Sequence, residues 1–152
     1  MDGDILNIGD RAWRCISGYG HAPEHMALFC AELTTLISGD MVLPRISTNV
    51  SVHAREPEAN PLQLFLDSLL RYLDLPESTL VLPSHGKPFT GLATRIAQLQ
   101  DHHRERLEEI LQAARDHALS AADTLPILFK RKLDTCLLYT SDAADDSLRV
   151  DL

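Results

Sequence analysis

The chain has 152 residues, enough for one domain with a substantial hydrophobic core. Hydrophobic residues make up 45% of it and charged residues 24%, which is ordinary for a soluble globular protein, and no apolar run approaches the ~20 residues that a membrane span needs. The net charge of −8 argues against a general nucleic-acid-binding surface. Three widely spaced cysteines, Cys15, Cys30 and Cys136, fit neither a disulfide framework nor a cysteine-rich zinc site and favour a reducing cytoplasm.

The first part of the chain has the pattern of a β-sheet. Residues 3–38 are expected to form strands, among them 11–17 and the continuous apolar run 26–31, whose length fits a strand buried on both faces. Glu32 and Leu33 then turn the chain into 34–38, which predicts a hairpin. A loop rich in turn-forming residues follows from 39 to 60.

The second part alternates helices with one strand. Asn60 is a suitable N-cap for a helix over 61–73, and Pro61 suits its first turn. Six apolar residues on one face of this helix are expected to pack on the sheet: Leu62, Phe65, Leu66, Leu69, Leu70 and Leu73. A short buried strand over 79–82 precedes a long amphipathic helix over 92–117, and Ser120 and Asp123 predict the start of a last helix.

The segment from residue 136 onward differs from the rest. Residues 136–146 can be back-translated into the transposon end and adapter of a sequencing library, and residues 150–152 fit the same adapter after an index. The alternative is an ordinary acidic tail. We therefore predict that residues 136–152 are translated adapter sequence that packs poorly, and that the natural sequence is interrupted after about residue 135.

Three short segments place possible metal ligands directly after predicted strands. They are residues 18–25, which contain Gly-His-x-Pro-x-His, residues 38–40, Ser-Gly-Asp, and residues 83–86, Pro-Ser-His-Gly. Imidazole and carboxylate groups are zinc ligands where thiolates are absent, and a glycine beside a ligand allows a tight turn. Each segment alone is a weak signal. Their order, with a hairpin and then a helix and a strand between them, is a strong one.

This ordered set resembles the metallo-β-lactamase superfamily from about residue 5 to residue 133. The resemblance implies an α/β fold, with residues 1–117 forming the C-terminal half of a metallo-β-lactamase αβ/βα sandwich, followed by a helical segment. Residues 118–135 resemble the opening of a winged-helix-like appendage, as found in some members. The alternative is a terminal helix that packs on the long one.

The resemblance also implies a role for each motif residue. His21 matches the third histidine of the first metal site, Asp40 the carboxylate that bridges two metal ions, and His85 the terminal histidine of the second site. His25 matches the second histidine of its motif, which acts behind the ligands; the alternative is a structural hydrogen bond in the loop. Glu24 stands where many relatives have glycine, which puts the shape of this loop in doubt. Two zinc ions are the implied cofactors.

An aspartate at position 40 narrows the implied function. Glyoxalase II-like, lactonase and nuclease members carry aspartate here, whereas the best-known zinc β-lactamases carry cysteine. A bridging carboxylate favours a two-metal site whose bridging hydroxide cleaves an ester, thioester, lactone or similar bond. The expected partner is a small-molecule substrate, with neither a membrane nor nucleic acid as a partner. The sequence predicts no oligomeric state.

One family motif, His-x-His-x-Asp-His, is absent from the sequence. It supplies further ligands to both metal sites, so we expect the chain to be part of a longer enzyme and inactive by itself. Two alternatives stay open: an RNA-processing nuclease of the same fold, and a non-enzymatic helical interaction module built on residues 92–133. The acidic charge argues against the nuclease, and the module leaves the three motifs unexplained.

Overall fold

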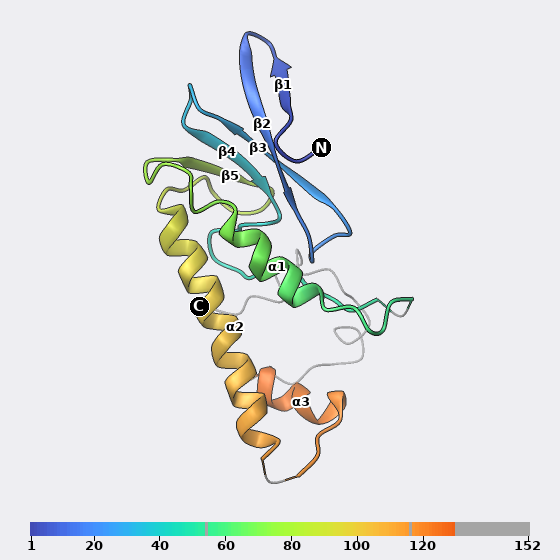
Figure 1. Ribbon diagram of the computed structural model, residues 1–152. Coiled ribbons are helices and arrows are strands. Elements are labelled where there is room, and N and C mark those ends of the chain that lie inside the picture. The colour runs from blue at the N-terminus through green and yellow to red at the C-terminus, as the bar shows by residue number, and fades with distance from the viewer. Residues whose placement is uncertain (54, 116, 130–152) are drawn as a thin grey trace. The chain divides into compact units, whose positions relative to one another are not determined.

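The computed structural model describes residues 1–53, 55–115 and 117–129 (Figure 1). This part of the chain forms a five-stranded sheet and helices, which confirms the predicted α/β class. The described residues divide into two compact units, the first over Met1–Ile96 and the second from Ala97 onward. The predicted limits at residues 117 and 135 stay predictions, and the predicted adapter segment 136–152 lies outside the described residues. The elements in chain order are β1 (Ile5–Ile8), β2 (Arg11–Gly18), β3 (His25–Cys30), β4 (Thr35–Gly39), α1 (Pro61–Leu70), β5 (Leu80–Pro83), α2 (Leu92–Ala113) and α3 (Ala121–Leu128).

The strands lie in the sheet in their order along the chain, β1-β2-β3-β4-β5. The first three pairings are antiparallel, and β4 pairs with β5 in parallel. The predicted hairpin is confirmed: β3 and β4 pair with Cys30 opposite Thr35, and Thr34 takes a positive φ of 48° in the turn. The long connection between β4 and β5 carries the predicted loop and α1.

The apolar run in β3 is buried on only part of its length. Ala27, Phe29 and Cys30 are buried, whereas Met26 is 36% exposed and Leu28 is half-buried. The expectation of burial on both faces is therefore wrong for Met26. A continuous apolar run shows that both faces of a strand are apolar, but it does not show which face is covered by the rest of the protein.

Helix α1 begins as predicted and ends earlier. The side chain of Asn60 accepts a hydrogen bond from the backbone N–H of Gln63, and Pro61 occupies the first turn. The helix ends at Leu70 instead of residue 73, and Leu70 and Leu73 are both exposed. The buried face is narrower than the apolar pattern suggests, and it contains Phe65, Ser68, Leu69 and, beyond the helix end, Tyr72.

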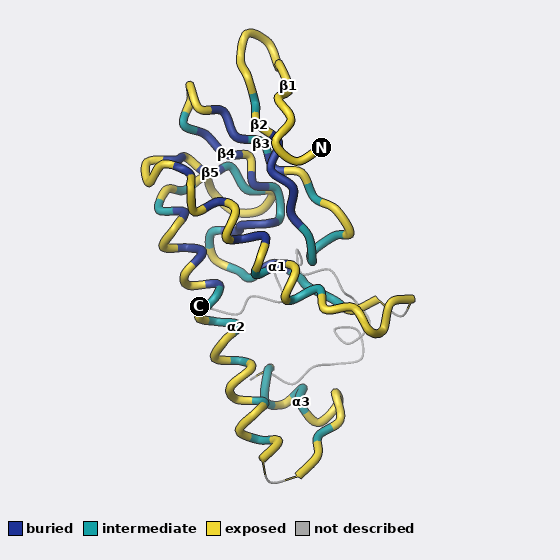
Figure 2. The backbone as a smooth tube through the Cα atoms, viewed as in Figure 1, coloured by how far each residue is buried: buried dark blue, intermediate teal, exposed yellow. Residues whose placement is uncertain are grey.

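The core of the first unit lies where α1 and the start of α2 meet the inner side of the sheet (Figure 2). Phe29, Leu36 and Val81 are register partners across three strands, and all three are buried. Phe65 of α1 and Ile96 of α2 are fully buried as well. Burying large apolar side chains contributes roughly 1.5–3 kcal/mol each. Two of the strands that carry this core, β4 and β5, lead directly to the predicted ligands Asp40 and His85.

Helix α2 is buried at its start and exposed further along. Leu92, Ile96 and Leu99 are buried, but Leu107 is 44% and Leu111 66% exposed, so the apolar face predicted over the whole helix is covered only at the start. His102 and His103, expected on the solvated surface, are half-buried. Burial, and then the neighbouring His102, lower the pKa of His103 to about 4.

Helix α3 begins with the predicted capping box. Ser120 accepts from the backbone N–H of Asp123, and the Asp123 carboxylate accepts from the backbone N–H of Ser120. None of its residues is buried. Among the described helices, none is both long enough and apolar enough to cross a membrane.

Candidate metal centre

The predicted ligands meet at one edge of the sheet. Because β2 and β4 are both antiparallel to β3, they run in the same direction, and β5 is parallel to β4. The carboxyl ends of these three strands therefore point to the same edge, and His21, Asp40 and His85 each follow one of them. Nε2 of His21 lies 3.7 Å from Oδ2 of Asp40, and Nε2 of His85 lies 3.4 Å from Oδ1. The structure thus brings together the three side chains for which the sequence predicts metal binding.

Asp40 lies between the two histidines and presents a different carboxylate oxygen to each. The register between β4 and β5 shifts between Ile37 and Gly39, which ends regular pairing just before Asp40. The Thr48 hydroxyl donates a hydrogen bond to the Asp40 backbone carbonyl. Oδ1 of Asp40 is buried and has no hydrogen-bond partner among the described residues. A buried carboxylate oxygen without a donor is costly, so this atom is suited to a bound cation.

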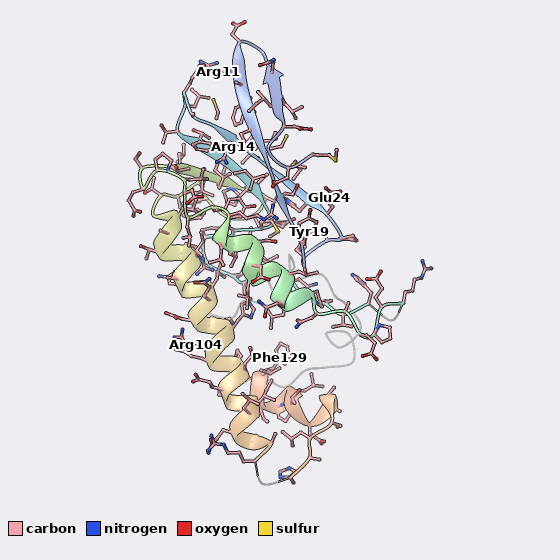
Figure 3. The ribbon with its side chains drawn as sticks, in the orientation of Figure 1. Arg11, Arg14, Tyr19, Glu24, Arg104 and Phe129 are labelled. Atoms are coloured by element: carbon pink, nitrogen blue, oxygen red, sulfur yellow. The ribbon has the colours of Figure 1, made fainter. Side chains whose placement is uncertain are left out.

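His21 is held by contacts to α1 and to the loop after Asp40. The backbone N–H of Tyr19 donates to Oγ of Ser68 in α1 at 2.9 Å. Gly20 has a φ of +97°, and a methyl group there would lie 2.3 Å from the Pro61 carbonyl oxygen, so only glycine fits this approach. Tyr19 and Glu24 lie at the same end of β2 and β3, near this loop (Figure 3).

The orientation of the His21 ring follows from one hydrogen bond. Nδ1 lies 2.9 Å from the backbone carbonyl oxygen of Asn49. A carbonyl only accepts, so Nδ1 carries a proton, and in the neutral imidazole the lone pair is then on Nε2, the nitrogen that faces Asp40. A backbone carbonyl behind a metal-ligating histidine is a common arrangement that fixes the tautomer of the ligand.

His85 follows β5 and is the most exposed of the three side chains, at 44% against 28% for His21 and 29% for Asp40. The backbone N–H of Ser84 donates to the Gly39 carbonyl at 3.1 Å, which ties the segment before His85 to the segment before Asp40. This bond continues the parallel pairing of β4 and β5 into the site. A ligand carried on two paired strand ends is held more rigidly than one on a free loop.

His25 lies against the turn that precedes Asp40. A methyl group at Gly39 would come within 2.2 Å of its Nε2, so the ring packs directly on the turn that precedes Asp40. Burial lowers the pKa of His25, His21 lowers it further, and Asp40 raises it. Nδ1 of His25 is buried without a hydrogen-bond partner among the described residues. A supporting role behind the ligands remains a prediction.

The spacing around Asp40 fits shared metal ligation. N–H···O hydrogen bonds are usually about 2.7–3.2 Å long, and the distances from Asp40 to Nε2 of His21 and of His85 are both longer than that. Two ligand atoms at about 2.0–2.1 Å from one tetrahedral zinc ion lie about 3.4 Å apart. However, no three His, Cys, Asp or Glu side chains of the described part of the chain surround one point that could hold an ion. Each side of the site therefore has one histidine and one oxygen of Asp40 among the described residues, and completing either side needs further ligands.

Several contributors to this site were not found from the sequence. Thr48 contributes its hydroxyl and Asn49 its backbone carbonyl from an irregular loop, for which the sequence pattern contains no signal. Arg95 is buried and donates to the same loop. A signal for Arg95 existed, because it lies between Leu92 and Ile96 on the apolar face of α2, where a charged residue is exceptional.

Comparisons with known proteins agree with this geometry. The sequence model of the metallo-beta-lactamase superfamily matches residues 2–85, a range that contains His21, Asp40 and His85. A solved beta-lactamase domain protein from Burkholderia ambifaria is 57% identical to this chain. Its TM-score is 0.88, and the match covers 91% of this chain and 41% of that one.

Two curated relatives match most of this chain. The probable metallo-hydrolase YqjP of Bacillus subtilis is 28% identical over 135 residues, which cover 87% of this chain and 42% of that protein. The hydroxyacylglutathione hydrolase of Rhodobacter capsulatus is 28% identical over 143 residues, which cover 93% of this chain and 52% of that protein. The chain therefore spans about half the length of these relatives or less.

Proposed function

Because the chain belongs to the metallo-beta-lactamase superfamily, we propose that the protein is a metal-dependent hydrolase whose ligands include His21, Asp40 and His85. The single observation that carries this proposal is the position of the Asp40 carboxylate, whose two oxygens face two different histidines from neighbouring strand ends. A non-enzymatic helical module would leave that arrangement unexplained. Two zinc ions are the proposed cofactors, and His21, Asp40 and His85 would hold them together with further ligands.

The side chains of this site have distinct tasks in the proposed enzyme. Asp40 supplies the negative charge shared between the two sides, and its Oδ1, which accepts no hydrogen bond from any described residue, faces His85. His21 presents Nε2 because Asn49 holds its Nδ1 proton. His85 is exposed enough to lie on the side that a substrate approaches. The metal, when bound, supplies a Lewis acid that polarises the bond to be cleaved.

The proposed substrate is a small molecule with an ester, thioester or lactone bond. The carboxylate at position 40 supports this class, and the Rhodobacter relative is itself named hydroxyacylglutathione hydrolase. The net charge of −8 gives no support to a polyanionic substrate. For location we propose the cytoplasm, supported by the buried free thiols of Cys15 and Cys30.

The test joins residues 1–135 to an upstream half that carries His-x-His-x-Asp-His and measures turnover of ester, thioester, lactone and phosphodiester substrates. Asp40→Asn and His85→Ala should each lower kcat/KM by about 100-fold or more. Losing a residue that only supports a metal ligand typically costs about 10- to 100-fold, and losing a ligand should cost at least as much as the upper end of that range. His53→Ala, at an exposed histidine outside the site, is the control. Turnover that survives both site substitutions would refute the proposal, and cleavage of the phosphodiester alone would replace the substrate class.

A further inference from the structure

Arg95 is a buried charge that lies outside the group of predicted ligands. It is 5% exposed on the inward face of α2, and burial lowers the pKa of its guanidinium. Nε donates to the Leu43 carbonyl at 2.7 Å, and Nη2 donates to the Ile46 carbonyl at 3.0 Å. Burying a guanidinium is costly unless its donors are used, so these two bonds hold the side chain and the loop together.

The loop that Arg95 holds leads directly into two contacts with the site, made by consecutive residues. The Thr48 hydroxyl donates a hydrogen bond to the backbone carbonyl of Asp40. The backbone carbonyl of the next residue, Asn49, accepts a hydrogen bond from Nδ1 of His21. Leu43 and Ile46 lie between Asp40 and Thr48 in the sequence. A displacement of residues 43–46 would therefore change the support of the carboxylate and of one histidine together.

We propose that Arg95 is a positioning residue for the metal centre, which acts by fixing the loop that orients His21 and supports Asp40. The part concerning metal rests on the proposed function, whereas the part concerning the His21 ring does not. The guanidinium is suited to this task because its planar fork reaches two carbonyls at once. Lysine has one nitrogen at this position and methionine has none.

The test records histidine side-chain ¹⁵N spectra of the full chain at pH 8 without metal. The unaltered chain should show His21 with its proton on Nδ1. Arg95→Met should lose this form as the main species, and Arg95→Lys should retain part of it. Arg104→Met is the matched control, because Arg104 lies on the same helix and pairs with Asp101. The control should leave His21 unchanged.

A zinc titration of the same samples gives the second readout. Arg95→Met should weaken the response of His21 to zinc by about tenfold, the lower end of the effect of losing a partner behind a ligand. If Arg95→Met folds and His21 keeps its proton on Nδ1 as in the unaltered chain, the proposal is overturned. If Arg95→Met does not fold, a fully unaltered His21 tautomer in Arg95→Lys would overturn it. Failure of His21 to respond to zinc in the unaltered chain would count against the metal centre, not against the positioning by Arg95.

Discussion

Strands β4 and β1 belong to one sheet, and both are held by backbone pairing, β4 between two neighbours and β1 against β2 alone. Thr35 and Leu36, neighbouring positions of β4 on opposite faces, are both buried, whereas all four residues of β1 are exposed (Figure 2). β4 leads directly into Asp40, and no predicted ligand follows β1. Pairing alone is enough to make a strand, but packing on its faces is what fixes the place of the residue after it.

The largest effect is expected from a substitution that disrupts the packing of β4. Leu36→Ala should lower the free energy of unfolding by about 3–5 kcal/mol, because it removes a fully buried side chain and leaves a cavity. Leu6→Ala in β1 should cost at most about 0.5 kcal/mol, since that side chain is exposed. Urea denaturation followed by circular dichroism measures both. Equal losses in the two strands would mean that the comparison is wrong.

A second pair of variants separates backbone strain from packing. Gly9, in the turn after β1, and Gly20, in the loop before His21, both have a positive φ. A methyl group added at Gly9 would have no atom within 4 Å, whereas one added at Gly20 would collide with the backbone of α1. Gly9→Ala should cost about 1 kcal/mol of unfolding free energy from the backbone alone. Gly20→Ala should cost about 2–4 kcal/mol, because the methyl group also collides with the backbone of α1. Denaturation midpoints that fall by the same amount would show that the loop before His21 is not tightly packed.

The helix caps sharpen the comparison on a smaller scale. Asn60→Ala removes the N-cap of α1, whose buried face belongs to the core, and should lower the free energy of unfolding by about 1 kcal/mol. Ser120→Ala removes the cap of α3, which has no buried residue, so it should reduce helix content locally and leave the global midpoint in place. Circular dichroism and amide hydrogen exchange distinguish the two. A global loss from Ser120→Ala would contradict this.

A further expected effect is a dependence of stability on pH. Because the pKa of His103 falls to about 4 in the folded chain, folding favours its neutral form. The resulting contribution to stability is fully present above about pH 6.5 and is lost as the pH falls towards 4. His103→Gln should therefore flatten the decline of the urea midpoint between pH 7 and pH 5, and His117→Gln should not. A decline of the same slope in both variants and the unaltered chain would show that the half-burial of His103 has no such consequence.

The sequence predicts the elements near the site well, because their signals are local. Asn60 and Pro61 mark the start of α1, and the predicted hairpin puts Asp40 after a strand parallel to β2. The direction of the strands then follows from topology, so that His21, Asp40 and His85 share an edge. These predictions need the order of elements and not the packing of side chains.

The predictions that failed depend on which surface covers which face. Met26, Leu70 and Leu111 look like core residues in the sequence and are exposed in the structure, and His103 looks like a surface residue and is half-buried. A helical or alternating pattern of apolar residues indicates which face of an element is apolar, but not which part of the molecule covers that face. Asn49 contacts His21 from an irregular loop and Arg95 contacts the same loop, whose path no periodic pattern encodes.

The central claim is that Asp40 joins His21 and His85 in one metal-binding group, and a zinc titration followed by histidine ¹⁵N resonances tests it most directly. Nε2 of His21 and of His85 should shift together on addition of zinc, while exposed His53 should not, and Asp40→Asn should diminish both shifts because each histidine faces one oxygen of that carboxylate. Site histidines that respond no more than His53, or that respond fully in the Asp40→Asn variant, would contradict the account.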